Sequence, residues 1–366
     1  MIDFKQHVSK VVERILVPND LNYLVVMSAS NIFYLSGSDA PSALVVSKEG
    51  EVSALASRLE YFRAVSETSG LRVVAFAREG EDVSEYEEVV RGDFYEALSR
   101  MVSGSERIGV VGASCEAKEK LAEKTGKQLY DYSKEFSLIR RVKDPGELEA
   151  INRAARLAEL AMRKALDTLE PGVTESEVAS EILKVIVSSG AYPSFPPIVA
   201  FGEHAAHPHA KPSLRRLIKG DFVKIDLGAK VDGYCSDMTR TLVFGEPSEK
   251  QRRIFEAVVK AQESALASIK AGVQAREVHA IALRALKEAG LSQYFNHGLG
   301  HGVGVDIHEE PYLNLQSEAV LLEGDVVTVE PGVYLPGYGG VRIEDMVYVE
   351  RGGGRLLTFF SKDMVV

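Results

Sequence analysis

Several features are scarce in this sequence, and each scarcity narrows the classes of protein to consider. Only two of the 366 residues are cysteines, Cys115 and Cys235, too few and too far apart to predict a disulfide framework or a cysteine-rich zinc site. No apolar run approaches the roughly 18 residues that a membrane-spanning helix needs. Residues 1–16, MIDFKQHVSKVVERIL, alternate apolar and charged positions like an amphipathic helix and contain no signal-peptide core. We therefore expect a cytoplasmic protein with reduced thiols and no membrane partner.

An excess of positive charge is also lacking. The formal net charge is −10 at pH 7 and the pI is about 5.5, which argues against nucleic acid as an obligate partner. The segment GVVGAS at residues 109–114 lacks both the G-x-G-x-x-G spacing and a P-loop lysine, so it predicts a plain strand-to-helix turn. What is present, 45% hydrophobic and 26% charged residues, is ordinary for a globular protein.

The length suggests two domains. The part up to residue 138 alternates strand-like and helix-like segments, which predicts an α/β domain. We expect its strands at residues 23–27, 42–47, 73–77 and 107–112, and its helices at residues 84–103 and 115–126. A helix start follows at Asp144, which can cap a helix, with Pro145 in the first position and Glu147 completing a capping box. We therefore expect domains of residues 1–138 and 139–366, the second opening with a helix that runs to Leu169.

The second part contains an internal repeat of helix, helix and β-hairpin. The matching pairs are GVTESEV with GVQAREV (residues 172–178 and 272–278), KGDFVKIDLG with EGDVVTVEPG (219–228 and 323–332), Gly190 with Gly290, and Gly233-Tyr234 with Gly337-Tyr338. Such a duplication predicts an α+β domain with a pseudo-two-fold axis.

The repeat places acidic side chains in equivalent positions of its two halves. Asp226 ends the strand-like run FVKI and corresponds to Glu330, while Asp237 lies near the position that corresponds to Glu344. If helices cover the outer face of the sheet, its inner face brings the two hairpins and all four carboxylates together. Such a cluster repels itself by kcal/mol amounts unless it is protonated or binds cations, and two divalent ions would balance four negative charges.

The segment NHGLGHGVGVDIHEEP, residues 296–311, offers a histidine as a fifth ligand. Oxygen ligands with one imidazole suit Mn, Co, Fe or Zn, and paired ions can activate a water for hydrolysis. Each acidic residue taken alone favours a capped turn or a surface charge. The symmetric placement of four is what favours a dinuclear site. The alternate glycines of this segment are typical of a strand that other groups approach closely, rather than of phosphate binding.

The order D…D…H…E…E resembles that of the pita-bread metallopeptidases, which include methionine aminopeptidases, aminopeptidase P, Xaa-Pro dipeptidases (prolidases) and their non-hydrolytic relative creatinase. The resemblance covers residues 140–366 and implies the pita-bread (creatinase/aminopeptidase) fold for this part. It implies that two divalent metal ions are the cofactors. The ligands implied are Asp237 and Glu344, shared by both ions, Asp226 on one ion, and His301 with Glu330 on the other.

The resemblance also implies roles for further residues of the site. These are His209 on the substrate side, His308 at the transition state, His297 in the pocket, Arg342 as a support and Glu330 as general base. His204 and His207, which share the segment HAAHPHA with His209, are expected to be bystanders.

The segment SASNIFYLSG, residues 28–37, resembles the N-terminal domain of prolidases, aminopeptidase P and creatinase. Methionine aminopeptidases lack that domain, so the proline-directed branch is favoured. The retained metal ligands argue against creatinase and against binding-only relatives. The resemblance implies a small peptide substrate with proline in second place, and a homodimer.

Hydrolysis of Xaa-Pro dipeptides is the function we expect first. The Xaa-Pro bond is a tertiary amide without an N–H, so a site that holds the free amino end and activates water need not read that hydrogen. Many prolidases carry arginine directly after HE-x-P, whereas Tyr312 follows Pro311 here. The group that reads the substrate carboxylate is therefore open, and an aminopeptidase P that accepts longer peptides is the alternative. The alternative from another class is a non-catalytic pita-bread protein that binds peptides or partners.

Overall fold

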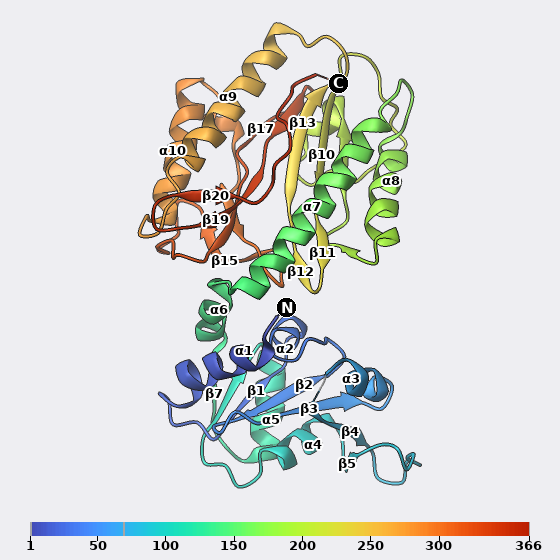
Figure 1. Cartoon of the computed structure of the whole chain (residues 1–366), viewed down its shortest axis with the longest axis vertical. Helices are drawn as coiled ribbons and strands as arrows, with labels where there is room; N and C mark the ends of the chain where they lie inside the picture. The colour runs from blue at the N-terminus through green and yellow to red at the C-terminus, as the bar shows by residue number, and fades with distance from the viewer. Residues whose placement is uncertain (1, 69, 366) are drawn as a thin grey trace. The chain divides into compact units, whose positions relative to one another are not determined.

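The computed structural model describes residues 2–68 and 70–365, which form two compact units (Figure 1). One unit spans Ile2–Arg140 and the other begins at Arg141. The expected domain boundary after residue 138 lies within helix α6 (Ser133–Arg141), and the assignment of residues 1–138 and 139–366 to two domains stays a prediction. None of the helices in the described part of the chain combines the length and the apolar character needed to span a bilayer.

The N-terminal unit is built on a seven-stranded mixed sheet, as its α/β pattern predicts. Its strand order is β5-β4-β3-β2-β1-β6-β7. The strands are β1 (Tyr23–Val26), β2 (Ala43–Ser47), β3 (Val52–Ser57), β4 (Arg72–Ala77), β5 (Val89–Arg91), β6 (Ile108–Val111) and β7 (Leu129–Asp131). The helices are α1 (Phe4–Val11), continued by a π-helical turn over Val12–Leu16, α2 (Ala29–Ser36), α3 (Tyr61–Glu67), α4 (Phe94–Met101), α5 (Cys115–Thr125) and α6. The four expected strands are confirmed as β1, β2, β4 and β6.

The helix expected over residues 84–103 is wrong in its first half. Val89 and Val90 instead form β5, which pairs in parallel with β4. The helix begins only at Phe94, because Asp93 caps it in a reciprocal capping box with Glu96. Two adjacent β-branched residues and a strong helix start therefore outweigh the helical spacing of the segment. The helix expected over residues 115–126 is confirmed as α5.

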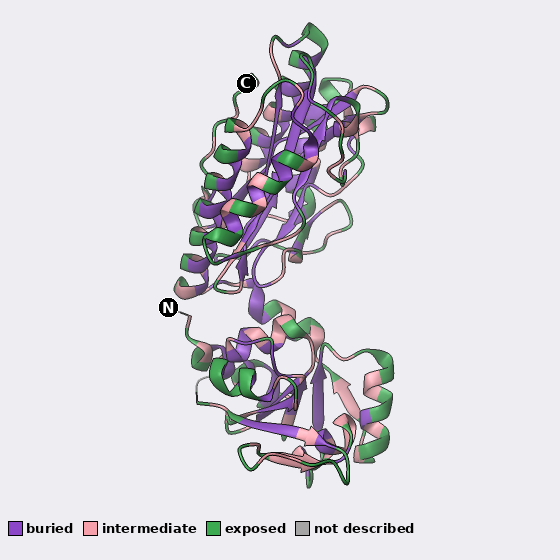
Figure 2. Ribbon diagram, turned by 90° about the vertical axis from the view of Figure 1, so that its right-hand side faces the viewer, coloured by how far each residue is buried: buried purple, intermediate pink, exposed green. Residues whose placement is uncertain are grey.

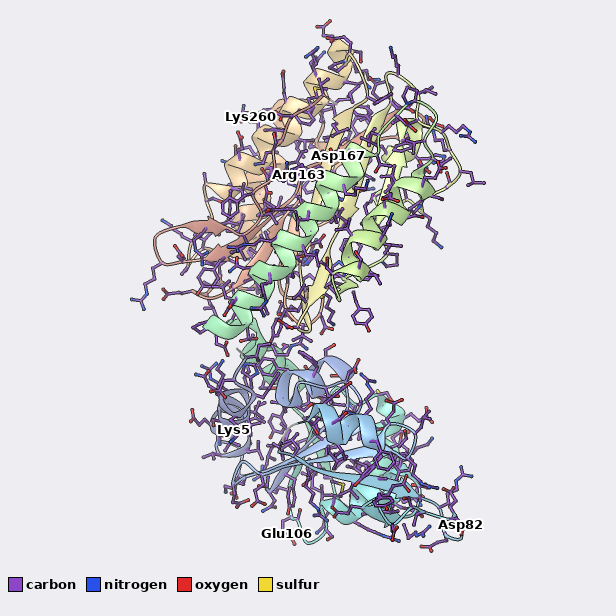
Figure 3. All side chains as sticks on the ribbon, turned by 45° about the vertical axis from the view of Figure 1, so that its right-hand side comes forward. Lys5, Asp82, Glu106, Arg163, Asp167 and Lys260 are labelled. Carbon is purple, nitrogen blue, oxygen red and sulfur yellow. The ribbon has the colours of Figure 1, made fainter. Side chains whose placement is uncertain are left out.

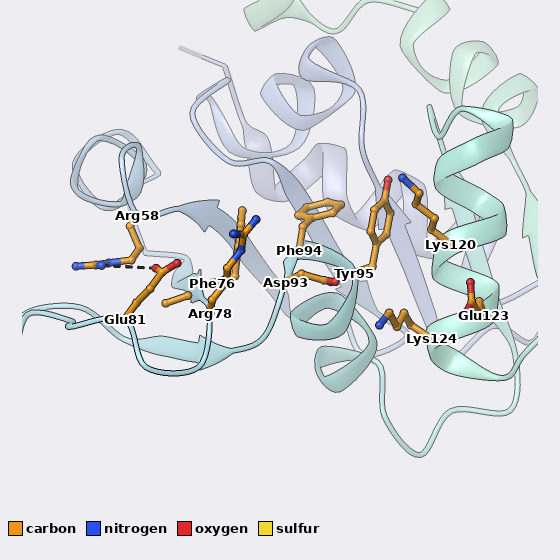
Figure 4. A pocket seen from close by; sticks show the side chains of 11 residues that line it. Arg58, Phe76, Arg78, Glu81, Asp93, Phe94, Tyr95, Lys120, Glu123 and Lys124 are labelled. Carbon is orange, nitrogen blue, oxygen red and sulfur yellow. Dashed lines mark ion pairs between the residues drawn. The ribbon is translucent and has the colours of Figure 1, made fainter.

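A hollow of about 730 Å³ opens between the end of β4 and helices α4 and α5 (Figure 4). Most of its basic side chains already have acidic neighbours. Arg58 pairs with Glu81 and Glu87, Lys120 pairs with Glu116, and Lys124 pairs with Glu96. These ion pairs are those of a solvated surface, and they leave the hollow little uncompensated positive charge.

The second unit consists of two similar halves. In the first, α7 (Pro145–Asp167) and α8 (Glu175–Ser188) pack on β9 (Ile198–Phe201), β10 (Phe222–Leu227) and β13 (Met238–Val243), with a small sheet of β8 (Tyr192–Pro193), β11 (Ala229–Val231) and β12 (Tyr234–Cys235). In the second, α9 (Glu249–Leu266) and α10 (Ala275–Glu288) pack on β14 (Gly300–Gly302), β15 (Glu309–Leu313), β16 (Val326–Val329), β19 (Asp345–Val349) and β20 (Gly354–Leu356), with a hairpin of β17 (Gly332–Leu335) and β18 (Gly339–Arg342).

The backbone of the two halves confirms the repeat that the sequence predicts. Glycines at matching positions share a positive φ that favours glycine: 89° at Gly172 and 91° at Gly272, and 74° at Gly190 and 73° at Gly290. Isolated β-bridges recur in the same way, Thr174 with Arg216 and Gln274 with Val320. The pita-bread fold with a pseudo-two-fold repeat is therefore observed.

The helices of the second unit shield its strands from solvent. Helix α7 starts at the expected capping box of Asp144 and Glu147, and its small apolar residues face the sheet. The strands beneath the helices are buried, whereas the outer faces of the helices are exposed (Figure 2). Charged residues such as Arg163, Asp167 and Lys260 lie on those outer faces (Figure 3). Polar groups buried within the sheet are therefore exceptions that need a reason.

Gly228 shows how closely the acidic strands approach one another. It follows β10, and a Cβ atom at this position would collide with the backbone carbonyl of Ser236, which precedes Asp237. Any side chain here would push the segment that carries Asp237 away from the strand that carries Asp226.

Substitution Gly228→Ala is expected to destabilise the protein by about 1–3 kcal/mol, because the backbone carbonyl it meets cannot move aside cheaply. The urea midpoint measured by circular dichroism reports this loss. Gly352→Ala is the matched control, since no atom lies within 4 Å of the added Cβ in that exposed loop. Equal midpoints for the two variants would contradict the close approach.

Candidate metal centre

A pocket of about 950 Å³ opens over the inner face of the duplicated sheet. All nine side chains expected from the sequence to form the site line it: His209, Asp226, Asp237, His297, His301, His308, Glu330, Arg342 and Glu344. The structure therefore brings together residues from segments more than 130 positions apart in the chain, from 209 to 344. Their roles stay predictions; their proximity is observed.

The two hairpins position the acids in equivalent ways. Asp226 lies within β10, and Asp237 directly precedes β13, its antiparallel partner. Glu330 directly follows β16, and Glu344 directly precedes β19, which pairs antiparallel with β16. Each half thus contributes one carboxylate from each of two paired strands. Paired strands are rigid supports, so the four groups are held in a fixed arrangement.

Asp237, His301 and Glu344 form the tightest group. One ligand atom from each lies within 4.8 Å of the others, and all three residues are buried. The Nε2 atom of His301 lies 3.7 Å from an oxygen of Asp237 and 3.3 Å from an oxygen of Glu330. This spacing is suitable for ligands that converge on cations between them.

The hydrogen bonds of His301 orient its free nitrogen toward the acids. Its Nδ1 atom lies 3.0 Å from the backbone oxygen of Gly302, which can only accept, so Nδ1 carries the hydrogen. Nε2 then faces the oxygens of Asp237 and Glu330, where it can hold a proton that pairs with Glu330 or present a lone pair to a cation. Lone pairs facing carboxylates repel unless a proton or a cation lies between them. A histidine that binds metal commonly donates its other ring N–H to a carbonyl in this way.

Three carboxylate oxygens test directly whether the site fits cations. Oδ1 of Asp226, Oδ1 of Asp237 and Oε1 of Glu344 are buried and lack a hydrogen-bond partner in the described residues. Leaving a buried acceptor unsatisfied costs about 1–3 kcal/mol for a neutral group and more for a charged one. Three such oxygens in one ligand set fit divalent cations, whose preferred donors include carboxylate oxygens and imidazole nitrogen.

The pKa values of these side chains reflect the same conflict. Burial, and then the charges of Glu344, Asp226 and Glu330, raise the pKa of Asp237 well above its usual range. Burial and the neighbouring carboxylates likewise raise the pKa of Glu344. Burial would also raise the pKa of Glu330, but the hydrogen bond and charge of His301 outweigh it and hold that pKa to about 2. The neighbouring side chains therefore stabilise the charged form of Glu330 but not those of Asp237 and Glu344.

Arg342 supports the first-half acid from the second half. Its guanidinium is buried, forms an ion pair with Asp226, and donates from Nε to Oγ1 of Thr239 at 3.1 Å. Oγ1 of Thr239 in turn donates to Glu344 at 2.6 Å. In the other half, Oγ1 of Thr328 lies 3.3 Å from Glu330. Two threonines thus orient one carboxylate each.

His297 is held through Tyr334. Its Nδ1 atom lies 2.7 Å from the backbone oxygen of Gly298, so Nε2 accepts from the hydroxyl of Tyr334 at 3.0 Å. That hydroxyl accepts from Arg342 at 2.9 Å. Burial is the main cause that lowers the pKa of His297, which favours this neutral form. Both ring nitrogens are therefore engaged, and the residue is suited to shaping the pocket.

His209 and His308 differ from His297 in having ring nitrogens available to a substrate. Both line the pocket and are exposed, and the described residues provide no hydrogen-bond partner for either ring. The ring of His308 packs edge-on against His301 at 4.3 Å between centroids. His204 instead bonds to the buried Glu175, and neither His204 nor His207 lines the pocket.

Sequence reasoning missed the residues that hold the site from behind. Lys224 is fully buried, and its ammonium donates to the carbonyls of Ala205 at 3.1 Å, His207 at 2.5 Å and Pro208 at 3.4 Å. It thereby fixes the loop that carries His209. The sequence does indicate Lys224, because a residue two positions before Asp226 in a strand lies on the same face of the sheet. Tyr334 and the two threonines gave no comparable signal.

Removal of metal by a chelator is expected to lower the melting temperature, because the orphaned oxygens and the repelling charges lose their partners. A ligand present at a hundredfold excess over its Kd contributes about 2.7 kcal/mol to stability. Differential scanning calorimetry with and without chelator measures the change. The Asp237→Ala protein is the control, and its melting temperature should respond much less. An unchanged melting temperature in the wild type would contradict a buried metal cluster.

Comparisons with known proteins agree with this geometry. Residues 149–351 match the model of metallopeptidase family M24, and residues 10–142 match the creatinase/prolidase N-terminal domain. The Xaa-Pro dipeptidase of Pyrococcus horikoshii is 36% identical over 363 residues, which cover 98% of this chain and 99% of that protein.

Solved structures extend the likeness to the whole chain. A structure of Xaa-Pro dipeptidase from Bacillus anthracis has a TM-score of 0.89 at 29% identity and full coverage of both chains. The X-Pro aminopeptidase from Thermotoga maritima has a TM-score of 0.83 at 30% identity, covering 95% of this chain and 98% of that one. The chain belongs to metallopeptidase family M24, and it carries the creatinase/prolidase N-terminal domain.

Proposed function

We propose that this protein hydrolyses the Xaa-Pro bond of dipeptides with two divalent metal ions. The observation that carries the proposal is the convergence of four buried carboxylates and His301, with three carboxylate oxygens left without partners. Full-length relatives that bear the name Xaa-Pro dipeptidase support the substrate class.

The residues that would hold the ions are those that the resemblance to pita-bread metallopeptidases implies, and all of them line the pocket. By that resemblance, Asp237 and Glu344 would be shared by both ions. Asp226 would complete one ion, and His301 with Glu330 the other. When bound, two ions lower the pKa of water and polarise a carbonyl, which is the chemistry that hydrolysis of a peptide bond needs.

The chain's own residues supply the remaining steps. Glu330 is positioned by Thr328 and His301 to accept a proton from the attacking water. His308 has free ring nitrogens beside His301 and would donate a hydrogen bond to the developing oxyanion. His209, which also lines the pocket, would assist the departing proline nitrogen. Arg342 and Tyr334 keep Asp226 and His297 in place.

The pocket wall is suited to a proline ring. One side consists of Phe195, Pro196, Pro197 and Ile198, all apolar. Such a wall accepts an apolar ring. Since the Xaa-Pro nitrogen has no hydrogen to donate, nothing in the substrate is left unsatisfied there.

Aminopeptidase P activity on longer peptides is the second candidate. The X-Pro aminopeptidase from Thermotoga maritima resembles this chain over nearly its whole length. Tyr312, which lines the pocket, carries no positive charge that would demand a free carboxylate. A non-catalytic peptide-binding role is the third candidate, and the complete set of ligand side chains disfavours it.

Several finer properties belong to the same proposal. We infer Mn, Co, Zn or Fe as the metal, because the donor set combines carboxylates with one imidazole. We also propose a cytoplasmic homodimer, in which residues 1–138 form the N-terminal domain and residues 139–366 the catalytic domain. Likeness to prolidases supports the dimer and the location.

Leu-Pro and Leu-Pro-Leu, each assayed with Mn or Co added, test the proposal. Release of leucine from Leu-Pro at the higher kcat/KM is expected. A preference for Leu-Pro-Leu would favour aminopeptidase P instead. Turnover of neither peptide, by protein shown to contain metal, would refute both. A protein that binds no transition metal after dialysis and reloading would favour the non-catalytic role.

Substitution Asp237→Ala is expected to reduce kcat by at least about a thousandfold, because it removes an oxygen donor shared by both ions. Steady-state rates on Leu-Pro and metal content by mass spectrometry measure the effect together. Asp232→Ala is a control, since Asp232 lies on an exposed turn of the same hairpin and outside the pocket. Wild-type turnover by Asp237→Ala would contradict the ligand assignment.

A further inference from the structure

The pocket has one positively charged side chain that its own acids do not use. Two lining residues carry a full positive charge, Lys211 and Arg342. Arg342 is buried and paired with Asp226. Lys211 is exposed, and within residues 2–68 and 70–365 its side chain has no ion pair or hydrogen bond. Its charge is therefore available to a ligand.

The loop that carries Lys211 is anchored on both sides. On one side, the buried Lys224 donates to the carbonyls of His207 and Pro208. On the other, the backbone N–H and the hydroxyl of Ser213 donate to the buried Glu175 at 3.0 and 2.5 Å. A proline directly after Lys211 restricts its backbone further. The lysine Cα is thus fixed at the pocket wall, while the side chain keeps its freedom.

The chemistry of the pocket indicates what this cation would bind. An Xaa-Pro dipeptide carries a carboxylate only one residue from its scissile bond, and must bring it into a pocket that contains four acids. Two bound ions would offset those acids, but a carboxylate that loses its hydration on entering the pocket still needs a positively charged or hydrogen-bonding partner. Of the pocket's remaining polar residues, Tyr312, Asn296 and Asn314 are uncharged. A lysine is a point charge that can follow a mobile carboxylate.

We propose that Lys211 binds the carboxylate of the substrate's C-terminal proline and so makes the pocket selective for dipeptides. This inference rests on the proposed Xaa-Pro hydrolysis. It assigns to the loop after His209 the recognition that Tyr312 cannot supply. The leaving proline would then meet His209 at its nitrogen and Lys211 at its carboxylate, both from one anchored segment.

The experiment compares Leu-Pro with Leu-Pro-amide, which differs in lacking the negative charge. The quantity measured is the ratio of kcat/KM for the acid to kcat/KM for the amide. The wild type should favour the acid. Lys211→Met should lower the ratio about tenfold, as expected for loss of a hydrogen bond to a charged group. Lys211→Arg should retain a ratio above that of Lys211→Met. Lys219→Met is the matched control, because Lys219 is also exposed and lies shortly before β10, outside the pocket.

The outcomes separate this inference from the function on which it rests. A wild-type ratio near one, or a ratio that Lys211→Met leaves unchanged while Leu-Pro is still cleaved, overturns the role of Lys211 alone. Cleavage of no Xaa-Pro substrate by metal-loaded wild type overturns the proposed function and the inference together. Since a ratio between two substrates is insensitive to the fraction of folded protein, general loss of structure cannot imitate the expected result.

Discussion

The mutual repulsion of four buried carboxylates is the constraint on which the rest of this structure depends. Buried carboxylates that line one pocket are tolerated only with protons or cations between them. The surrounding residues compensate the negative charges unevenly. Arg342 forms an ion pair with Asp226, and His301 forms one with Glu330. Asp237 lies 3.7 Å from Nε2 of His301, Glu344 accepts from the neutral hydroxyl of Thr239, and burial raises the pKa of both. The centre therefore needs protons or cations among its carboxylates.

The duplicated fold explains how such a cluster can be held at all. Equivalent strands in the two halves present their acids from opposite sides, so each half needs to accommodate two charges rather than four. Paired strands also limit the movement by which the acids could separate, and Gly228 lets two of the acidic segments approach without a side chain between them. The repeat thus supplies both proximity and rigidity.

Much of this was predictable because acids in buried strands are conspicuous in a sequence. The constant offset between the two copies of the repeat matches Asp226 with Glu330, and the glycines at equivalent positions determine the alignment of the two copies. Residues that act through tertiary contacts left weaker traces. Tyr334 reaches His297 and Arg342 only because β17 folds beside them, and nothing in its neighbourhood in the sequence indicates that. The helix predicted over residues 84–103 is wrong before Phe94, because the spacing of its apolar residues is also compatible with a strand. Pairing with β4, which is distant in the sequence, makes Val89–Arg91 a strand.

The symmetry of the acids contrasts with the asymmetry of everything that faces substrate. Both halves give two carboxylates each, whereas His297, His301 and His308 all come from the second half. The first half contributes instead the anchored loop with His209 and Lys211, and the apolar wall from Phe195 to Ile198. The two halves contribute equal numbers of carboxylates to the metal centre. A peptide, however, has an amino end and a carboxyl end, so the residues that face it need to differ between the halves. In the proposed function, loops that differ around the same arrangement of strands would let one half position the water and the carbonyl, while the other would receive the departing proline.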